Sequence, residues 1–246
     1  MGSSGKARNS SGGSTTIDLR DRGVVEVDTP LVYGADGGHG QLPQSVIDFE
    51  EKRRTAKIEF SILTLNGDVI EENKGTKHHV AASDYARDRA DLLSHNHPRS
   101  GTSAGQLGGT FSPSDIKNFM SHPQATYRAV ASEGTYSISK GAGLANDAGL
   151  RSSFRNAYSQ FVNTRMSSLN ATLSSLRNDA NSTFNRINSD YVNGRISYAD
   201  RVSQMQATAT ACDRAQDRAF NNALIDMHNW LRDNQSTYGY TYGLER

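Results

Sequence analysis

The chain has little cysteine, little net charge and no long apolar run. Its 246 residues include one cysteine, Cys212, so no disulfide can form within the chain and no oxidising compartment is indicated. The formal net charge of +1 gives no overall support for nucleic-acid binding, which usually leaves a basic footprint. No stretch approaches the roughly 20 apolar residues of a membrane span, and residues 1–16 lack an apolar signal core. We therefore expect a cytoplasmic protein without membrane or nucleic-acid partners.

Composition separates a polar tail from a region of mixed periodicity. Residues 1–22 are rich in glycine and serine and are expected to be a disordered tail, whose first sixteen residues are either native or an expression remnant. From 23 to 146 the apolar pattern alternates between strand and helix periods, which is typical of an α+β domain with a mixed sheet flanked by helices. The predicted strands lie within 23–33 and at 57–65, 68–73, 91–97, 127–132 and 135–140, and the predicted helices at 43–55, 83–90 and 112–121.

Residues 147–235 have the pattern of two long amphipathic helices. Apolar residues recur in steps of three and four, and the pattern breaks at Gly194, just before a capping box of Ser197 and Asp200. We predict an antiparallel helical hairpin with arms of similar length, on the order of 50–60 Å at ~1.5 Å per residue. The two stripes comprise Val162, Met166, Leu169, Leu173, Leu176, Ala180, Phe184, Ile187 and Tyr191, then Tyr198, Val202, Met205, Ala209, Cys212, Ala219, Ala223, Met227 and Trp230.

Residues 236–246 are expected to form a strand, because Tyr238, Tyr240 and Tyr242 alternate as strand residues do. This strand would return to the edge of the sheet in region 23–146. The helical hairpin would then be an insertion before the last strand and not an independent domain.

Two histidines near the end of a predicted strand suggest a metal site. His95 and His97 are two residues apart in "SHNHP", so a strand places both imidazoles on one face. Imidazoles are good zinc ligands, and Asp115 in "SPSD" can supply a third ligand from the start of the next helix. Three protein ligands leave one tetrahedral position open for water, which is typical of a catalytic zinc site. Such a water needs a general base, for which glutamate is the usual choice.

These residues resemble the JAMM (JAB/MPN) metalloprotease pattern, in which an upstream glutamate precedes His-x-His-Pro and Ser-x-x-Asp. The similar words are "EF" at 59–60, "GT" at 75–76, "HNHP" at 95–98 and "SPSD" at 112–115. "HNHP" is similar to the version in RadC-like proteins and in JAB domains of phage head-morphogenesis proteins. The resemblance covers about residues 42–140. It implies a JAMM/cytidine-deaminase-like sheet within 23–146.

The resemblance also implies roles for individual residues. It implies zinc ligation by His95, His97 and Asp115, a general base at Glu59 and an oxyanion-stabilising hydroxyl at Ser112. The activity implied is that of a zinc metallopeptidase, an isopeptidase or deubiquitinase-like hydrolase that cuts an amide or isopeptide bond in a protein or peptide. One departure is the glycine-rich loop of fourteen residues between His97 and Ser112, which is longer than the family's usual loop.

The same residues also have simpler interpretations. "SPSD" alone reads as a helix start, with Ser112 as N-cap, Pro113 at the first position and Asp115 completing a capping box. The two roles of this segment are compatible. Other candidates for the base are Glu50, Glu51, Glu71 and Glu72, while His78 and His79 are expected at a pocket rim and His122 at the surface or as a helix C-cap.

Two further classes of function stay open on the sequence. The JAMM-like domain could be a scaffold in a phage virion or head-associated protein, with the hairpin as the interaction arm or as a surface for self-association. Such a protein would lie in the virion or in the host cytoplasm. A RadC-like role on DNA is the third hypothesis, and the near-neutral charge does not favour it.

Overall fold

The computed structural model describes residues 41–99 and 107–245. The tail predicted at 1–22 and the strand-like run within 23–33 lie outside these residues. The elements, in chain order, are α1 (Gln44–Arg53), β1 (Phe60–Leu65), β2 (Asp68–Lys74), α2 (Asp84–Arg87), β3 (Leu92–Asn96), α3 (Pro113–Ser121), β4 (Thr126–Ala131), β5 (Gly134–Lys140), α4 (Ala142–Asn146), α5 (Ala148–Val192), α6 (Tyr198–Asp233), α7 (Gln235–Tyr238) and β6 (Tyr240–Glu245).

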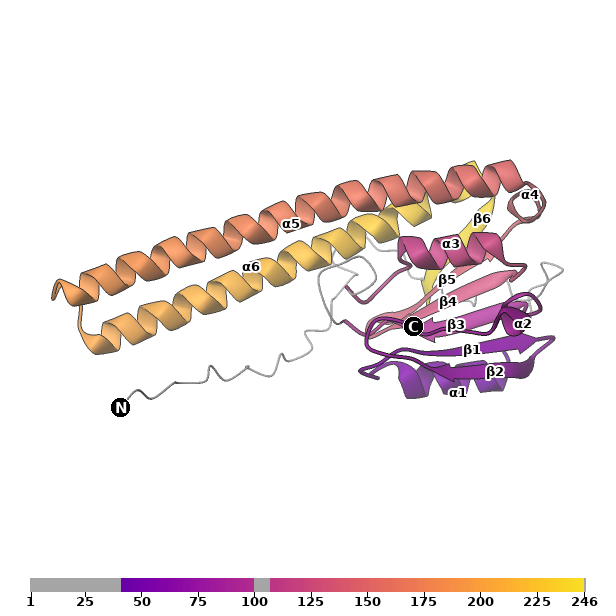
Figure 1. The fold of residues 1–246 in the computed structure, drawn as a ribbon, viewed down its shortest axis with the longest axis horizontal. Helices are drawn as coiled ribbons and strands as arrows, with labels where there is room; N and C mark the ends of the chain where they lie inside the picture. Colours follow the sequence, from indigo (N-terminus) through magenta and orange to yellow (C-terminus); the bar gives the residue numbers. More distant parts are fainter. Residues whose placement is uncertain (1–40, 100–106, 246) are drawn as a thin grey trace.

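One mixed sheet organises the compact end of the molecule (Figure 1). Its strand order is β2-β1-β3-β4-β5-β6, and only β3 and β4 are parallel. Parallel neighbours need a crossover connection, and here α3 lies in that connection. The chain is therefore α+β with a mixed sheet, as the sequence pattern predicted. Strand β6 pairs with β5 at the sheet edge, after the hairpin has left the sheet and returned.

The first strand pair turns where the "NGD" signal predicted. Asn66 and Gly67 both have positive φ, 53° and 89°, which suits a tight turn between twisted strands. However, β1 begins at Phe60 and not at residue 57. The backbone of Ile58 and Glu59 is bonded to the Asn96 side chain and to residues 75–76 in place of a regular ladder.

Other boundaries also differ from the sequence prediction. Helix α2 spans four residues, not 83–90, because the chain turns toward β3 and the Asp91 amide already bonds to the Thr64 carbonyl. The predicted C-terminal strand is shorter, because Tyr238 ends α7 and Gly239 adopts φ 69° before β6 begins. The alternation of tyrosines therefore extends to Tyr238 without a strand there.

The two faces of the sheet are covered by different helices. Helix α1 lies on one face, where Ser94 of β3 donates to Glu50 of α1 at 2.8 Å. On that face Arg128 binds both Glu50 and Glu245, with nearest distances of 2.6 and 2.7 Å. We call these three residues the arginine network. Arg128 is 1% exposed, so its charge is neutralised by carboxylates inside the protein.

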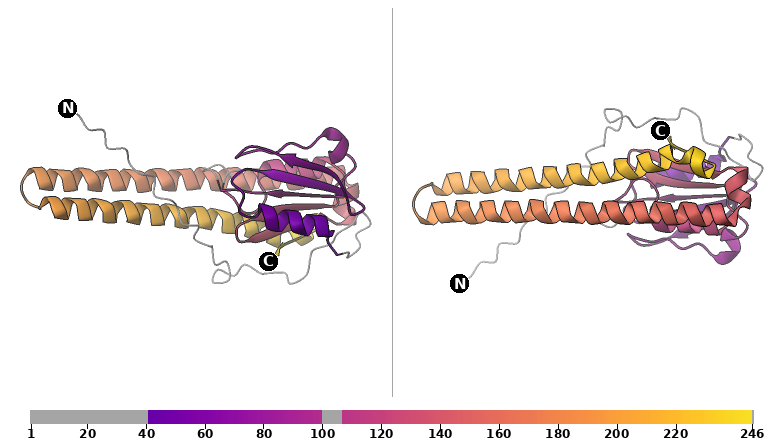
Figure 2. Two further views of the ribbon diagram at one scale, coloured as in Figure 1. Left: turned by 90° about the horizontal axis from the view of Figure 1, so that it is seen from below. Right: turned by 90° about the horizontal axis from the view of Figure 1, so that it is seen from above.

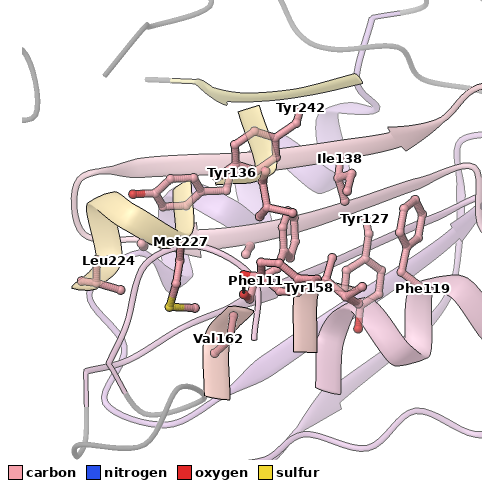
Figure 3. Close-up of a cluster of buried hydrophobic side chains, with 14 of the residues drawn as sticks. Phe111, Phe119, Tyr127, Tyr136, Ile138, Tyr158, Val162, Leu224, Met227 and Tyr242 are labelled. Carbon is pink, nitrogen blue, oxygen red and sulfur yellow. Dashed lines mark hydrogen bonds between the residues drawn. The ribbon is translucent and has the colours of Figure 1, made fainter. Parts of the chain in front are cut away.

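The opposite face packs on α3 and on the base of the hairpin. Figure 3 shows this core, where sheet residues meet side chains from α5 and α6. Several of its members are aromatic, and the rings of Phe154 of α5 and Trp230 of α6 stack at 6.0 Å. The base of the hairpin is therefore part of the main hydrophobic core. The core residues labelled in the figure are Phe111, Phe119, Tyr127, Tyr136, Ile138, Tyr158, Val162, Leu224, Met227 and Tyr242.

The two hairpin helices extend side by side well beyond the sheet (Figures 1 and 2). They turn through Gly194, whose φ is 68°, and Ser197 and Asp200 form the predicted capping box. The arms differ in length, since α5 has 45 residues and α6 has 36. At ~1.5 Å per residue α5 is therefore about 67 Å long, more than the sequence estimate. The extra turns belong to the N-terminal part of α5, which covers the sheet.

Burial along the predicted stripes falls with distance from the sheet. Val162, Leu173 and Met227 are buried. Beyond Leu173 the stripe positions are half-buried or exposed, apart from the buried Ile187, and near the turn Tyr191 and Tyr198 are exposed. None of the helices in the described part of the chain is long and apolar enough to cross a bilayer.

Candidate metal centre

Three side chains converge on one point beside the sheet. His95 lies on β3, His97 directly after it, and Asp115 in the first turn of α3. One possible ligand atom from each of the three lies within 4.8 Å of the others. The Nε2 atoms of His95 and His97 are 2.6 Å apart, and lie 3.2 and 3.3 Å from the two Asp115 carboxylate oxygens. We call these residues the donor cluster.

Local geometry explains why the donors meet. The amide of His97 bonds to the Val130 carbonyl at 2.8 Å, so the strand pairing continues past Asn96 and keeps both histidines on one face. Ser112 caps α3 in a capping box, with its amide donating to Asp115 at 2.7 Å and its hydroxyl at 2.6 Å. The helix start thus fixes the Asp115 carboxylate beside the two histidines, and its part in the capping box does not prevent it from binding a metal.

The donor set fits a zinc ion. The Nδ1 atom of His97 lies 2.9 Å from the Gly109 carbonyl, which can only accept, so Nδ1 carries the proton and Nε2 presents a lone pair. A backbone carbonyl on the far nitrogen is the usual support of a metal-binding histidine. Two imidazole nitrogens only 2.6 Å apart repel unless a proton or cation lies between them. Two imidazoles and one carboxylate suit Zn²⁺ and leave a fourth position free.

The residues of the donor cluster shift one another's pKa values. Burial raises the pKa of Asp115, but the two imidazoles and their hydrogen bonds outweigh it and hold that pKa well below its usual value. Burial lowers the pKa of His95, which therefore stays neutral more readily. For His97 burial is outweighed by the carboxylates of Asp115 and Glu59, which raise its pKa.

Glu59 lies beside this cluster just before β1. Its backbone is bonded on both sides to the segment after β2, through Thr76 and Gly75 at 2.7 and 2.8 Å. The side chain is 7% exposed and borders the same cavity as the two histidines. Burial raises the pKa of Glu59 to about 7, with Asp115 adding to the rise and His97 opposing it. A carboxyl that titrates near neutrality is suited to accept and return a proton.

A cavity of about 360 Å³ opens onto the donor cluster. Its wall includes Glu59, Ser112 and the donor cluster, so the structure brings all five predicted site residues together. His78 and His79 are exposed on this wall, and His122, the C-cap of α3, pairs with Asp88 at 3.1 Å. The remaining lining residues are Ser61, Val80, Ala81, Ala82, Arg87, Leu93, Ser114, Asn118, Gln124 and Tyr127.

The other candidate bases lie away from the donor cluster. Glu50 belongs to the arginine network on the opposite face. Glu71 accepts from Ser83 at the start of α2, and Glu72 pairs with Arg53 at 3.1 Å. Glu51 is exposed on α1.

Two residues to which the sequence motif assigns no role hold Glu59 in place. The Asn96 side chain accepts from the Phe60 amide at 2.6 Å and donates to the Ile58 carbonyl at 3.0 Å, so it ties down both neighbours of Glu59. At Gly75 a Cβ would lie 2.1 Å from the His79 carbonyl, so only glycine permits this crossing. The sequence could have indicated the position of Asn96. On a strand the residue between His95 and His97 points to the opposite face, away from the donor cluster.

No family model matches this chain, and neither a curated protein nor a solved structure matches it. The resemblance to JAMM metalloproteases therefore rests on the residues of the sequence motif alone. Fold and function have to be argued from the site itself.

Proposed function

We propose that the protein is a zinc-dependent metallopeptidase that hydrolyses an amide or isopeptide bond in a protein or peptide. The observation that carries the proposal is the convergence of His95, His97 and Asp115 beside a buried glutamate whose pKa is about 7. Zinc bound by these three ligands would supply a Lewis acid that polarises a carbonyl and lowers the pKa of water toward about 7.

The residues of the chain then have distinct roles. Glu59 accepts a proton from the attacking water and returns it to the leaving amine, a contribution typically worth about 10²–10⁴-fold in rate. Asn96 and Gly75 keep that carboxyl at the cavity wall. The Gly109 carbonyl accepts from His97 Nδ1, which leaves the lone pair on Nε2, where it would be available to a metal.

Ser112 has two possible roles that a variant separates. Its hydroxyl donates to Asp115 in this structure, so it orients a ligand carboxylate. The oxyanion role that the resemblance implies requires the hydroxyl to turn toward the substrate. Loss of an oxyanion donor costs about 10²–10³-fold in kcat. A Ser112→Ala variant that binds zinc normally but cleaves at least about 100-fold more slowly would support the oxyanion role.

Zinc content and cleavage together test the proposal. We expect about one zinc per chain by elemental analysis, and none after Asp115→Ala. Cleavage is screened by mass-spectrometric mapping of new termini, with the protein's own residues 1–22 and a peptide library as substrates. Glu59→Gln should retain zinc and lose cleavage, whereas Glu51→Gln, at an exposed position on α1, should behave as wild type. Absence of zinc uptake on reconstitution would refute the metal site, and unchanged cleavage in Glu59→Gln would refute the base.

The projecting hairpin supports a second candidate function, that of an interaction arm. Its distal half lies beyond the sheet (Figure 2), and Tyr191, Val192, Tyr198 and Val202 are exposed there. A protein that docks on its tip would bring the cavity to a substrate or to a larger assembly, such as a phage head. Chemical cross-linking in concentrated solution tests self-association through this arm. A cross-linked dimer lost on Tyr198→Ser and Val202→Ser would support it.

A further inference from the structure

The loop of residues 107–111, which lies directly before α3 and beside the donor cluster, forms hydrogen bonds with β6 and with the base of the hairpin. Thr110 of this loop is hydrogen-bonded to the Tyr242 hydroxyl of β6 at 2.6 Å, and both groups are buried. The next carbonyl, of Phe111, accepts from the Tyr158 hydroxyl of α5. Figure 3 shows Phe111, Tyr158 and Tyr242 gathered in the same core. Two tyrosines from the hairpin and the strand after it therefore fix consecutive residues of the loop.

Those two residues lie directly after the carbonyl that orients a metal ligand. Gly109, one residue before Thr110, accepts from His97 Nδ1 at 2.9 Å. Gly109 itself packs on α6, since a Cβ there would lie 3.0 Å from Leu224 and its φ is 109°. One side of this residue thus faces the hairpin and its carbonyl faces His97.

The Tyr242 hydroxyl also contacts a side chain of α6. His228 Nδ1 lies 3.0 Å from the Tyr242 hydroxyl, and the ring is 2% exposed. Burial lowers the pKa of His228 to about 4, so the ring stays a neutral partner at physiological pH. The chain of contacts His228–Tyr242–Thr110 therefore joins α6 to the loop through buried groups only.

The distal half of the hairpin has contacts of another kind. Its polar contacts join α5 to α6, as Cys212 to the Leu176 carbonyl and Arg201 to Asn188 do. Arg165 and Asp226 are bridged at 2.6 Å nearer the sheet. The same hairpin thus has a base that contacts the loop and a distal half whose polar contacts are internal to the hairpin.

We propose that Tyr242 and Tyr158, contributed by β6 and the hairpin base, are positioning residues of the metal centre. They hold the Gly109 carbonyl against His97, and zinc affinity depends on them and not on the distal half of the hairpin. This inference rests on the proposed function, because it concerns the same zinc site. It goes further because it assigns the base of the hairpin a role in orienting a zinc ligand.

Zinc affinity of matched tyrosine variants tests this proposal. Zn²⁺ alone is titrated against a competing chelator for wild type, Tyr242→Phe and Tyr240→Phe. Tyr240 is the matched control, because it is equally buried on β6 but its hydroxyl donates to the Leu231 carbonyl, away from the loop. Tyr242→Phe loses two buried contacts of its hydroxyl, to Thr110 and His228, and Tyr240→Phe loses one, so both should lower the Tm, Tyr242→Phe by more. Only Tyr242→Phe should weaken zinc binding, by about tenfold or more, as supporting partners of metal ligands typically do.

Two further variants make the result decisive. Thr110→Val removes the same contact from the loop side and keeps the test valid if Tyr242→Phe folds poorly. Removal of residues 177–183 and 206–212 shortens both arms by about two turns and should leave zinc affinity unchanged. Equal zinc affinity in wild type, Tyr242→Phe and Thr110→Val would overturn the positioning role while leaving the metallopeptidase proposal intact. Absence of zinc binding in wild type would overturn both.

Discussion

The sheet has a buried charged cluster on each face, and the two differ in where the positive charge comes from. The arginine network neutralises its two carboxylates with a permanent cation, the guanidinium of Arg128. In the donor cluster the carboxylate faces two imidazoles, which can each lose their proton. The first cluster lies beneath α1 and the second opens onto a cavity. A cluster that carries its own cation is structural, whereas one built from exchangeable donors is suited to bind a metal.

The largest expected effect comes from removing the cation of the arginine network. Arg128→Met removes the guanidinium that pairs with the buried Glu50 and the half-buried Glu245, and loss of one member of a buried ion pair costs about 3–5 kcal/mol. Urea unfolding measures this loss. The matched control is Arg53→Met, because Arg53 pairs with the half-exposed Glu72, and such surface pairs contribute about 0–1 kcal/mol. Similar losses in both variants would mean that the network is not the structural cluster described above.

Zinc should stabilise the protein through the donor cluster alone. A ligand that binds only the folded state adds about 2.7 kcal/mol at a concentration 100-fold above its Kd. We expect a Tm rise with zinc in wild type and in Arg128→Met, both compared with their metal-free forms. The rise should disappear in His97→Ala. A zinc-dependent rise that persists in His97→Ala would place the metal somewhere else.

The pH dependence of stability reports on the protonation of Glu59. Its pKa is about 7 in the folded protein against an ordinary value of 4.5, so the fold holds the proton more tightly than the unfolded chain does. The ionised carboxylate therefore destabilises the fold above pH 7 and has no effect below about pH 4.5. In the metal-free protein Glu59→Gln should therefore be more stable than wild type at pH 8. The difference should be on the order of 2 kcal/mol, which is less than the full pKa shift implies because solvent in the cavity screens the charge.

Denaturant unfolding at a series of pH values checks this sign. The difference between Glu59→Gln and wild type should shrink as pH falls from 8 to 4.5. Glu51→Gln, exposed on α1, should show no such trend. A difference between Glu59→Gln and wild type that stays constant across this range would contradict the raised pKa.

The smallest effect compares two identical capping boxes. Ser112 with Asp115 and Ser197 with Asp200 have the same hydrogen bonds, one beside the donor cluster and one at the hairpin turn. Loss of such a cap costs about 1 kcal/mol, so Ser112→Ala and Ser197→Ala should lower stability similarly. Only Ser112→Ala should weaken zinc affinity, because its hydroxyl also orients a ligand. Equal zinc affinity in both variants would exclude a role of the Ser112 hydroxyl in orienting the ligand, and the cleavage rate of Ser112→Ala would then decide the oxyanion role.

Features with a local cause could be predicted from the sequence. Strand periodicity placed His95 and His97 on one face, and the Asn66–Gly67 turn and both capping boxes followed from side-chain chemistry within four residues. The hairpin was also predictable, because helical stripes repeat locally. The convergence of Asp115 with the histidines needed a hypothesis about the motif, since nothing in the spacing alone closes the connection between them.

Tertiary structure decided what holds these pieces together. Asn96 reaches across 38 residues to the backbone of Ile58, and Tyr242 reaches across 132 residues to Thr110. The two charged side chains that shift the pKa of Glu59, His97 and Asp115, likewise lie on other segments of the chain. Local sequence patterns determine which face of a strand or helix a side chain lies on and where a helix begins. They do not record which distant group lies against it, because that depends on how the sheet, the loop and the hairpin base pack together.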